Sequence, residues 1–173
     1  LSATKGNSSL FSTGNITSDQ DNSGKMNTFG NQAIMVGASD GGNALVSYDK
    51  GTIASVGSGD GIRSWDEYSG TGASAKIILG ADAVVDASRG LSGIVIGNNN
   101  KGNISIAAGA VVHGGDRKND LSSNQIDIHQ VAGVRFTGEG TPDFVLDNAG
   151  VIDSMNDVVL VNELHNFVAP GAT

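Results

Sequence analysis

The feature that most constrains this sequence is a short cycle of strands and turns that fills residues 143–173. Three runs rich in β-branched residues follow one another there, separated by turn residues: Phe144-Val-Leu146, Val151-Ile152 and Val158-Val-Leu-Val161. The last residues, from Phe167 to Thr173, begin the cycle again. Apolar strands that return to their starting pattern after about twenty residues are typical of one coil of a parallel β-solenoid. Because one coil cannot bury its own apolar face, we expect further coils upstream.

A turn marker repeats through the rest of the chain. A residue that tolerates a tight turn stands two positions before a β-branched residue at Gly14-Asn-Ile16, Gly51-Thr-Ile53, Asp82-Ala-Val84, Gly109-Ala-Val111, Gly150-Val-Ile152 and Gly171-Ala-Thr173. Glycine reaches positive φ without steric cost, and Asp is one of its few substitutes. Successive markers are between 21 residues (Ile152 to Thr173) and 41 residues (Val111 to Ile152) apart. The unequal spacing predicts loops of different lengths inserted into a common coil.

Two families of apolar strands flank the markers. One family precedes them, at residues 10–11, 44–47, 76–79, 103–106, 144–146 and 167–168, and the other follows them, at 33–36, 61–64, 93–96, 125–128 and 158–161. We therefore predict an all-β fold, a parallel β-helix of about five irregular coils with inserted loops, and a helix content below about 10%. Residues 1–173 form a single segment in this interpretation, with residues 1–32 as a weakly ordered first coil, and the segment is expected to belong to a longer protein.

Stacking of equivalent strands predicts two interior columns of side chains. The first contains Val46, Ile78, Ile104 or Ile106, and Val145, and the second contains Ile53, Val84 or Val85, Val111 or Val112, and Ile152. An Asp placed at Ile78 or Val145 is then expected to prevent folding, because it would bury an unpaired charge.

Composition excludes several classes of partner and site. Gly accounts for 26 of the 173 residues and Pro for only 2, which is turn-rich without being collagen-like. A formal charge of −8 argues against binding to nucleic acid, because no cluster of Lys and Arg is present to neutralise the phosphates. The chain has no cysteine, so it forms no disulfide and has no thiolate ligand or nucleophile.

The best candidate for a binding site is the loop segment Trp65-Asp66-Glu67-Tyr68, which holds the only Trp and one of the two Tyr residues beside two carboxylates. Aromatic side chains with acids on a loop of a rigid scaffold are suited to binding a sugar or a protein surface. The alternative is that Trp65 folds inward and fills a gap at a corner of the coil.

The sequence indicates no catalytic, metal or cofactor site. Asp86 and His113 are expected on neighbouring coils at equivalent positions, where they could hydrogen-bond, but no nucleophile or third ligand is apparent beside them. His129 and His165 show no ligand spacing with each other or with His113, so all three are interpreted as exposed single histidines. We therefore expect that the chain is not an enzyme and that it binds no metal and no cofactor.

With irregular coils, turns such as Lys50-Gly-Thr-Ile53 and Asn148-Ala-Gly-Val-Ile-Asp-Ser154, no cysteine and an acidic charge, the chain resembles part of an autotransporter passenger domain. The resemblance covers roughly residues 33 to 173 and is a style of repeat, so it transfers no functional residue. It implies a right-handed parallel β-helix displayed on the surface of a Gram-negative bacterium or secreted from it. Membrane contact would then come only through a C-terminal barrel outside this segment.

Two functions remain open at this point. The first is a structural and adhesive segment that attaches to a host-cell protein or glycan, or to another cell by self-association. The second is a carbohydrate-active β-helix enzyme, similar to polysaccharide lyases or hydrolases, or its substrate-binding fragment. An enzyme should gather acids and bases in a groove on one sheet, whereas an adhesin should carry its binding groups on loops such as 65–73 and 113–124.

Overall fold

The chain folds into two parallel β-sheets. The computed structural model describes residues 1–3, 6–18, 32–38, 41–56, 59–65, 73–97, 101–115, 131–138, 143–155 and 157–163, and all regular structure in these ranges is β-strand. Sheet A contains six strands in the order β1 (Ser2–Ala3), β4 (Ile34–Ala38), β6 (Ile62–Trp65), β8 (Ile94–Gly97), β11 (Ala132–Gly138) and β14 (Asp157–Glu163). The predictions of an all-β fold and of little or no helix are confirmed for the described part of the chain.

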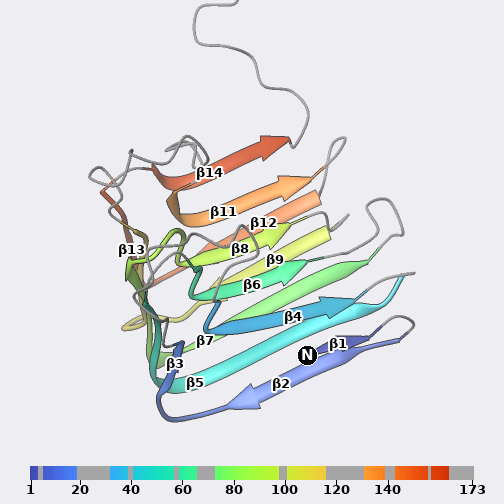
Figure 1. The fold of residues 1–173 in the computed structure, drawn as a ribbon, viewed down its shortest axis with the longest axis horizontal. Helices are drawn as coiled ribbons and strands as arrows, with labels where there is room; N and C mark the ends of the chain where they lie inside the picture. The colour runs from blue at the N-terminus through green and yellow to red at the C-terminus, as the bar shows by residue number, and fades with distance from the viewer. Residues whose placement is uncertain are drawn as a thin grey trace, which may run out of the picture.

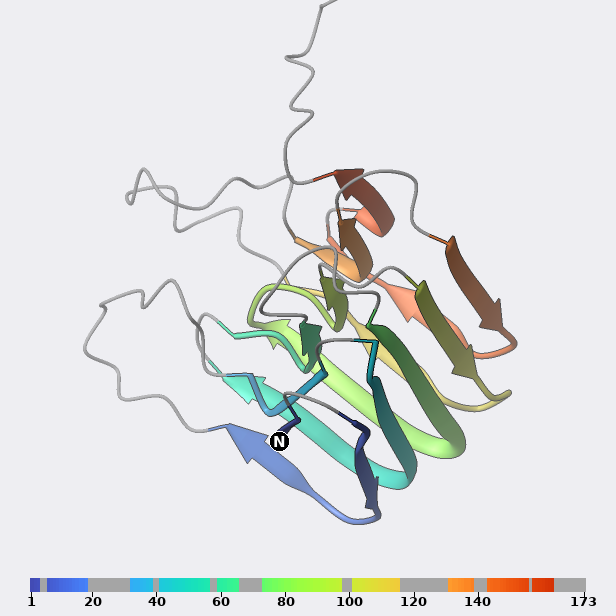
Figure 2. The ribbon, with the colours of Figure 1, turned by 90° about the vertical axis from the view of Figure 1, so that its right-hand side faces the viewer.

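Sheet B has two arms that meet at a corner. The first arm stacks β2 (Ser8–Ser12), the first halves of β5 (Asn43–Val56) and β7 (Ser74–Arg89), then β9 (Lys101–Ile106) and β12 (Asp143–Asn148). The second arm stacks β3 (Ile16–Ser18), the second halves of β5 and β7, then β10 (Val111–His113) and β13 (Val151–Asp153). β5 and β7 run through both arms and bend between them (Figure 2).

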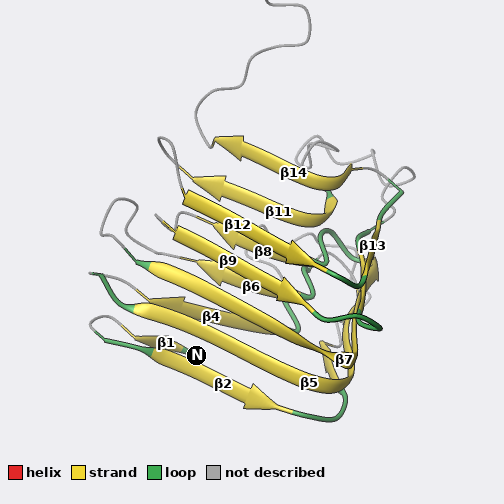
Figure 3. Ribbon diagram, turned by 180° about the vertical axis from the view of Figure 1, so that it is seen from behind, coloured by secondary structure: helices red, strands yellow, loops and turns green. Residues whose placement is uncertain are grey.

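The chain visits these surfaces in a constant order. In the described residues it passes along the first arm, the second arm and then sheet A five times, and we call each passage a repeat, from repeat 1 (β2, β3, β4) to repeat 5 (β12, β13, β14). Strands of sheet A rise in sequence order in Figure 1, and those of the first arm do so in Figure 3. Every pairing between repeats is parallel, so equivalent residues stand above one another.

The interior column of the first arm confirms half of the first predicted column and corrects the other half. The register joins Leu10, Val46, Ile77, Ile104 and Leu146. Val46 and Ile104 are therefore predicted correctly, whereas Ile78 and Val145 are wrong by one residue, and Val145 is 48% exposed. In the uninterrupted apolar runs around these two residues, the sequence does not reveal which side chain points inward, and a shift of one residue reverses the face.

The interior column of the second arm agrees with the prediction, and the structure decides the two choices that the sequence left open. The register joins Ile16, Ile53, Val85, Val112 and Ile152. Ile53, Val85 and Val112 are fully buried in the hydrophobic core. This column and the first one pack against the inward residues of sheet A, so the core lies between the three surfaces.

The backbone conformation at the corner between the two arms explains why glycine occurs there. Gly14 and Gly51 adopt φ of 93° and 107°, in the left-handed region. A Cβ on Gly51 would lie 2.6 Å from the Gly14 carbonyl oxygen and 2.8 Å from the Tyr48 hydroxyl, which itself donates a hydrogen bond to that carbonyl. The marker is one residue out of register at both Asp82 and Gly109, because the residues aligned with Ile53 are Val85 and Val112, each of which follows the marker valine by one position.

Four of the five strands predicted for sheet A are found, and a strand that was not predicted lies between β8 and β14. β4, β6, β8 and β14 overlap the predicted runs at 33–36, 61–64, 93–96 and 158–161. The predicted strand at 125–128 lies outside the described residues, and the strand that pairs with both β8 and β14 is β11. The predicted restart of the pattern at 167–173 lies outside the described residues, and so do residues 4, 5 and 19–31 of the predicted first coil, whose described part contains β2 and β3.

Candidate functional site

The predicted binding loop is only partly described. Trp65 is the last residue of β6, where its backbone pairs with Gly37 of β4 and Gly97 of β8. Asp66, Glu67 and Tyr68 lie outside the described residues. The loop therefore leaves sheet A from a strand that is paired on both sides, and its role in binding stays a prediction.

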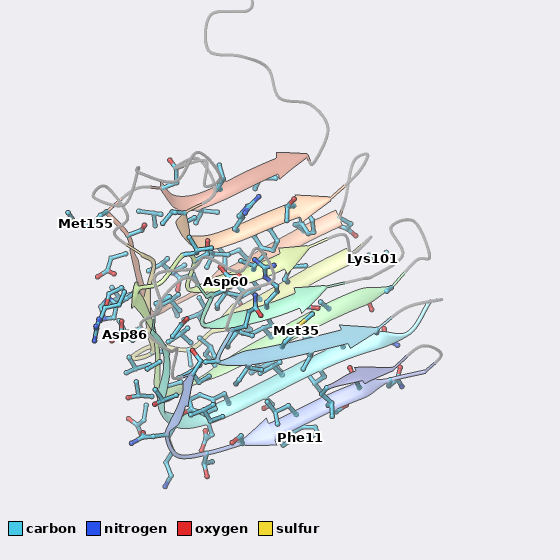
Figure 4. All side chains as sticks on the ribbon, in the orientation of Figure 1. Phe11, Met35, Asp60, Asp86, Lys101 and Met155 are labelled. Atoms are coloured by element: carbon cyan, nitrogen blue, oxygen red, sulfur yellow. The ribbon has the colours of Figure 1, made fainter. Side chains whose placement is uncertain are left out.

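A row of ionisable side chains lies on the outer face of the second arm. The register places Asp86 of β7, His113 of β10 and Asp153 of β13 directly above one another. Nδ1 of His113 lies 2.5 Å from Oδ1 of Asp153, and the two side chains are 37% and 57% exposed. Figure 4 shows Asp86 at the outer edge of the stack. The sequence correctly predicted that Asp86 and His113 are neighbours, but the hydrogen bond of His113 is made to Asp153.

Asp86 is held in its charged form by its surroundings. Its Oδ1 accepts hydrogen bonds from the backbone N–H and the hydroxyl of Ser88, at 2.9 Å and 2.6 Å. Partial burial alone would raise the pKa of the Asp86 carboxyl, but the hydrogen bonds from Ser88 and the charges of His113 and Arg89 outweigh it and lower the pKa. Asp86 is therefore an anion at neutral pH, next to the histidine.

The side chains of this row can carry out only a few kinds of chemistry. A carboxylate on Nδ1 fixes the orientation of the imidazole and leaves Nε2 as the group that can exchange a proton with a ligand. Among the described residues, no group of three or more His, Asp or Glu side chains is arranged to hold a metal ion. The arrangement can therefore bind a polar group or move a proton at Nε2, and we call Asp86, His113 and Asp153 the histidine row.

A second polar cluster lies inside the fold, between the second arm and sheet A, and sequence reasoning missed it. Asp60 is 1% exposed. Its Oδ2 accepts from Nε and Nη2 of Arg63 at 2.7 Å and 2.6 Å, and its Oδ1 accepts from the backbone N–H of Ser92 at 3.0 Å. The Ser92 hydroxyl in turn accepts from the backbone N–H of Ala132. Asp60 thus joins repeats 2, 3 and 4, which makes the cluster structural.

A recurring sequence pattern marks the place where the chain passes from the second arm to sheet A, although the spacing of the turn markers did not reveal it. Asp60, Ser92 and Ala132 each precede a glycine and then a β-branched residue: Gly61-Ile62, Gly93-Ile94 and Gly133-Val134. A Cβ on any of the three glycines would lie 2.4 Å from an inward side chain of the second arm, namely Val85, Val112 or Ile152. The recurring glycine thus marks where the second arm approaches sheet A most closely.

Comparison with known proteins does not assign the chain to a family. No protein-family model, no curated protein sequence and no solved structure matches it. In the part of the chain that is described, no helix is long and apolar enough to cross a membrane.

Proposed function

We propose that the chain is a surface-displayed structural and adhesive segment, in which the five repeats are the coils of a right-handed parallel β-helix of the autotransporter passenger kind. The observation that supports this function best is the parallel register that runs through all five repeats in both arms. Such a stack keeps its cross-section constant while the connecting loops vary in length. It is thus a scaffold that holds loops away from a surface.

The binding groups in this proposal are on a loop that leaves a well-anchored strand. β6 lies between β4 and β8 in sheet A, so the chain entering the segment from Trp65 to Tyr68 is fixed on both sides. An indole and a phenol offer a large contact area at a small entropic cost, and the two acids between them can pair with a basic partner or accept sugar hydroxyls. The partner is a host-cell protein or glycan, or another copy on a neighbouring cell.

The test is a double variant in which Trp65 and Tyr68 are replaced by Ala. If the loop binds, attachment of chain-coated beads to host cells or to a glycan array decreases, while the melting temperature changes by no more than about 2–4 °C, the shift that ~1 kcal/mol produces at this size. A matched control is Met155→Ala, which removes an apolar side chain that is 60% exposed on another surface. A large loss of melting temperature with unchanged binding per folded molecule would favour Trp65 as a corner residue and contradict the proposal.

One observation favours the second function, a carbohydrate-active β-helix. Asp153 orients His113 beside the anionic Asp86, and this is a geometry in which Nε2 can act as a general base. The test is the release of reducing ends or of unsaturated sugars from a panel of acidic and neutral polysaccharides. Activity that is lost in His113→Gln but kept in the loop variant would establish the enzyme in place of the adhesin.

A further inference from the structure

One short sequence pattern, Gly-Asn-x-Ser/Thr, occurs three times in the two arms, at residues 6–9, 14–17 and 102–105. An asparagine followed two positions later by Ser or Thr, with no proline between them, is the acceptor motif for N-linked sugars. No other asparagine of the chain stands in this motif. The middle residues, Ser8, Ile16 and Ile104, face inward. Each asparagine therefore shares the outer face with the hydroxyl residue of its own motif.

The structure separates the first two motifs from the third. Asn7 and Asn15 are exposed and stand just outside β2 and β3, directly after turn glycines with φ of 112° and 93°. Asn103 is half-buried and lies inside β9, where it pairs with Lys76 of β7 and Val145 of β12. A transferase must bind the backbone of the motif as well as the amide. The two turn positions therefore present an accessible amide, and the strand position does not.

Hydrogen bonds hold the amides of Asn7 and Asn15 with the nitrogen atom free. Oδ1 of Asn7 accepts from the backbone N–H and from Nδ2 of Asn43, at 3.2 Å and 2.9 Å. Oδ1 of Asn15 accepts from the backbone N–H of Thr52 at 3.0 Å. Within the described ranges, neither Nδ2 donates a hydrogen bond. An N-linked sugar replaces one hydrogen of Nδ2 and keeps the carbonyl oxygen, so it leaves these contacts with β5 intact.

We propose that Asn7 and Asn15, and not Asn103, are acceptors for N-linked glycosylation. In the transfer, Nδ2 forms a bond to the anomeric carbon of a sugar that is activated as a diphosphate ester. The bond from that carbon to the diphosphate oxygen breaks, and the diphosphate leaves with the bonding electrons. A base of the transferase takes the proton that Nδ2 loses. The proposal goes beyond the proposed function and does not depend on adhesion.

Production of the full chain together with a glycosyltransferase tests the proposal. The transferase reads Asn-x-Ser/Thr and uses a nucleotide-activated hexose, and peptides from the folded, soluble protein are mapped by mass spectrometry. We expect hexose on Asn7 and on Asn15. Ser9→Ala and Thr17→Ala each remove one motif at an exposed residue and keep the asparagine with its hydrogen bonds. Each variant should therefore lose the hexose at one site only.

Asn148 is a matched control within the same chain. It is exposed, and its Oδ1 accepts from the backbone N–H of Gly150 at 3.0 Å, but the residue two positions after it is glycine. Asn148 should therefore stay unmodified. Because no hydrogen bond is lost, the glycosylated chain should melt within about 2–4 °C of the unmodified chain.

Three results would overturn the proposal. The first is soluble chain without hexose on Asn7 and Asn15 while the same transferase modifies an acceptor peptide. The second is hexose on Asn103 at the same occupancy as on Asn7, because the fold would then not select the site. The third is glycosylated chain found only in the insoluble fraction, because the fold would then not tolerate the sugars.

Discussion

Two adjacent isoleucines in β7 provide a sharp test of which face of the strand is interior. Ile77 is fully buried and stacks between Val46 and Ile104, while Ile78 is partly exposed and lies between Ser47 and Ser105. Replacing a buried Ile by Ala costs about 2–5 kcal/mol, and the well-packed position of Ile77 suggests about 3–4 kcal/mol. The same change at Ile78 removes half-buried methylene groups and should cost about 1 kcal/mol.

Thermal unfolding followed by far-UV circular dichroism measures the difference. At this chain length 1 kcal/mol corresponds to about 2–4 °C, so Ile77→Ala should lower the melting temperature by roughly 6–16 °C and Ile78→Ala by roughly 2–4 °C. The two variants have the same composition and alter the same strand, so each is the control for the other. Equal shifts, or a larger shift for Ile78→Ala, would refute the register and with it the interior column.

Three further outcomes follow from the corners and the histidine row. Gly51→Ala should destabilise by about 1–3 kcal/mol and more than Gly6→Ala, because both positions have positive φ but only Gly51 lacks room for a Cβ; equal losses of melting temperature would contradict this. Asp60→Ala should cost about 3 kcal/mol or more, since it leaves Arg63 without its buried carboxylate, and a stability within 1 kcal/mol of wild type in urea would count against the cluster. Because the pKa of Asp86 is lowered in the folded state, its contribution to stability is present above its unfolded pKa of about 4 and is lost as the pH falls through the folded value. Asp86→Asn should therefore flatten the acid side of the pH–stability curve, and an unchanged curve would argue against the shift.

The order of the strands was predictable because the turn markers and β-branched runs recur in the same sequence in each repeat. Which side chains of a strand point into the core was predictable only where polar and apolar residues alternate. In the second half of β7 and in β10 two adjacent valines left two choices, and the structure uses the second valine, Val85 or Val112, in both strands. In β7 and β12 three apolar residues follow one another, so the sequence did not show which of them point inward. The pairing with the strands above and below decides this.

The candidate sites show a similar division. Asp86 and His113 were placed on adjacent strands from the markers, but Asp153 was not recognised as their neighbour, because Gly150 stands one residue before β13 whereas Gly109 stands two residues before β10. The burial of Asp60 could not be predicted from its own segment of sequence. Its partners come from repeats 2 and 3, and Asp60 is buried only because these repeats stack.

The continuity of β5 and β7 around the corner has a mechanical consequence. In repeats 2 and 3 one strand carries the chain through both arms, whereas in repeats 4 and 5 the chain leaves the ladder between β9 and β10 and again between β12 and β13. A pulling force on the C-terminal side would therefore act first on short ladders that are interrupted at the corner, and these can be peeled off one at a time. The load would then reach β7 and β5, whose longer runs of hydrogen bonds must shear together. Stretched from that end, the molecule should yield in small early steps and resist most strongly in its middle.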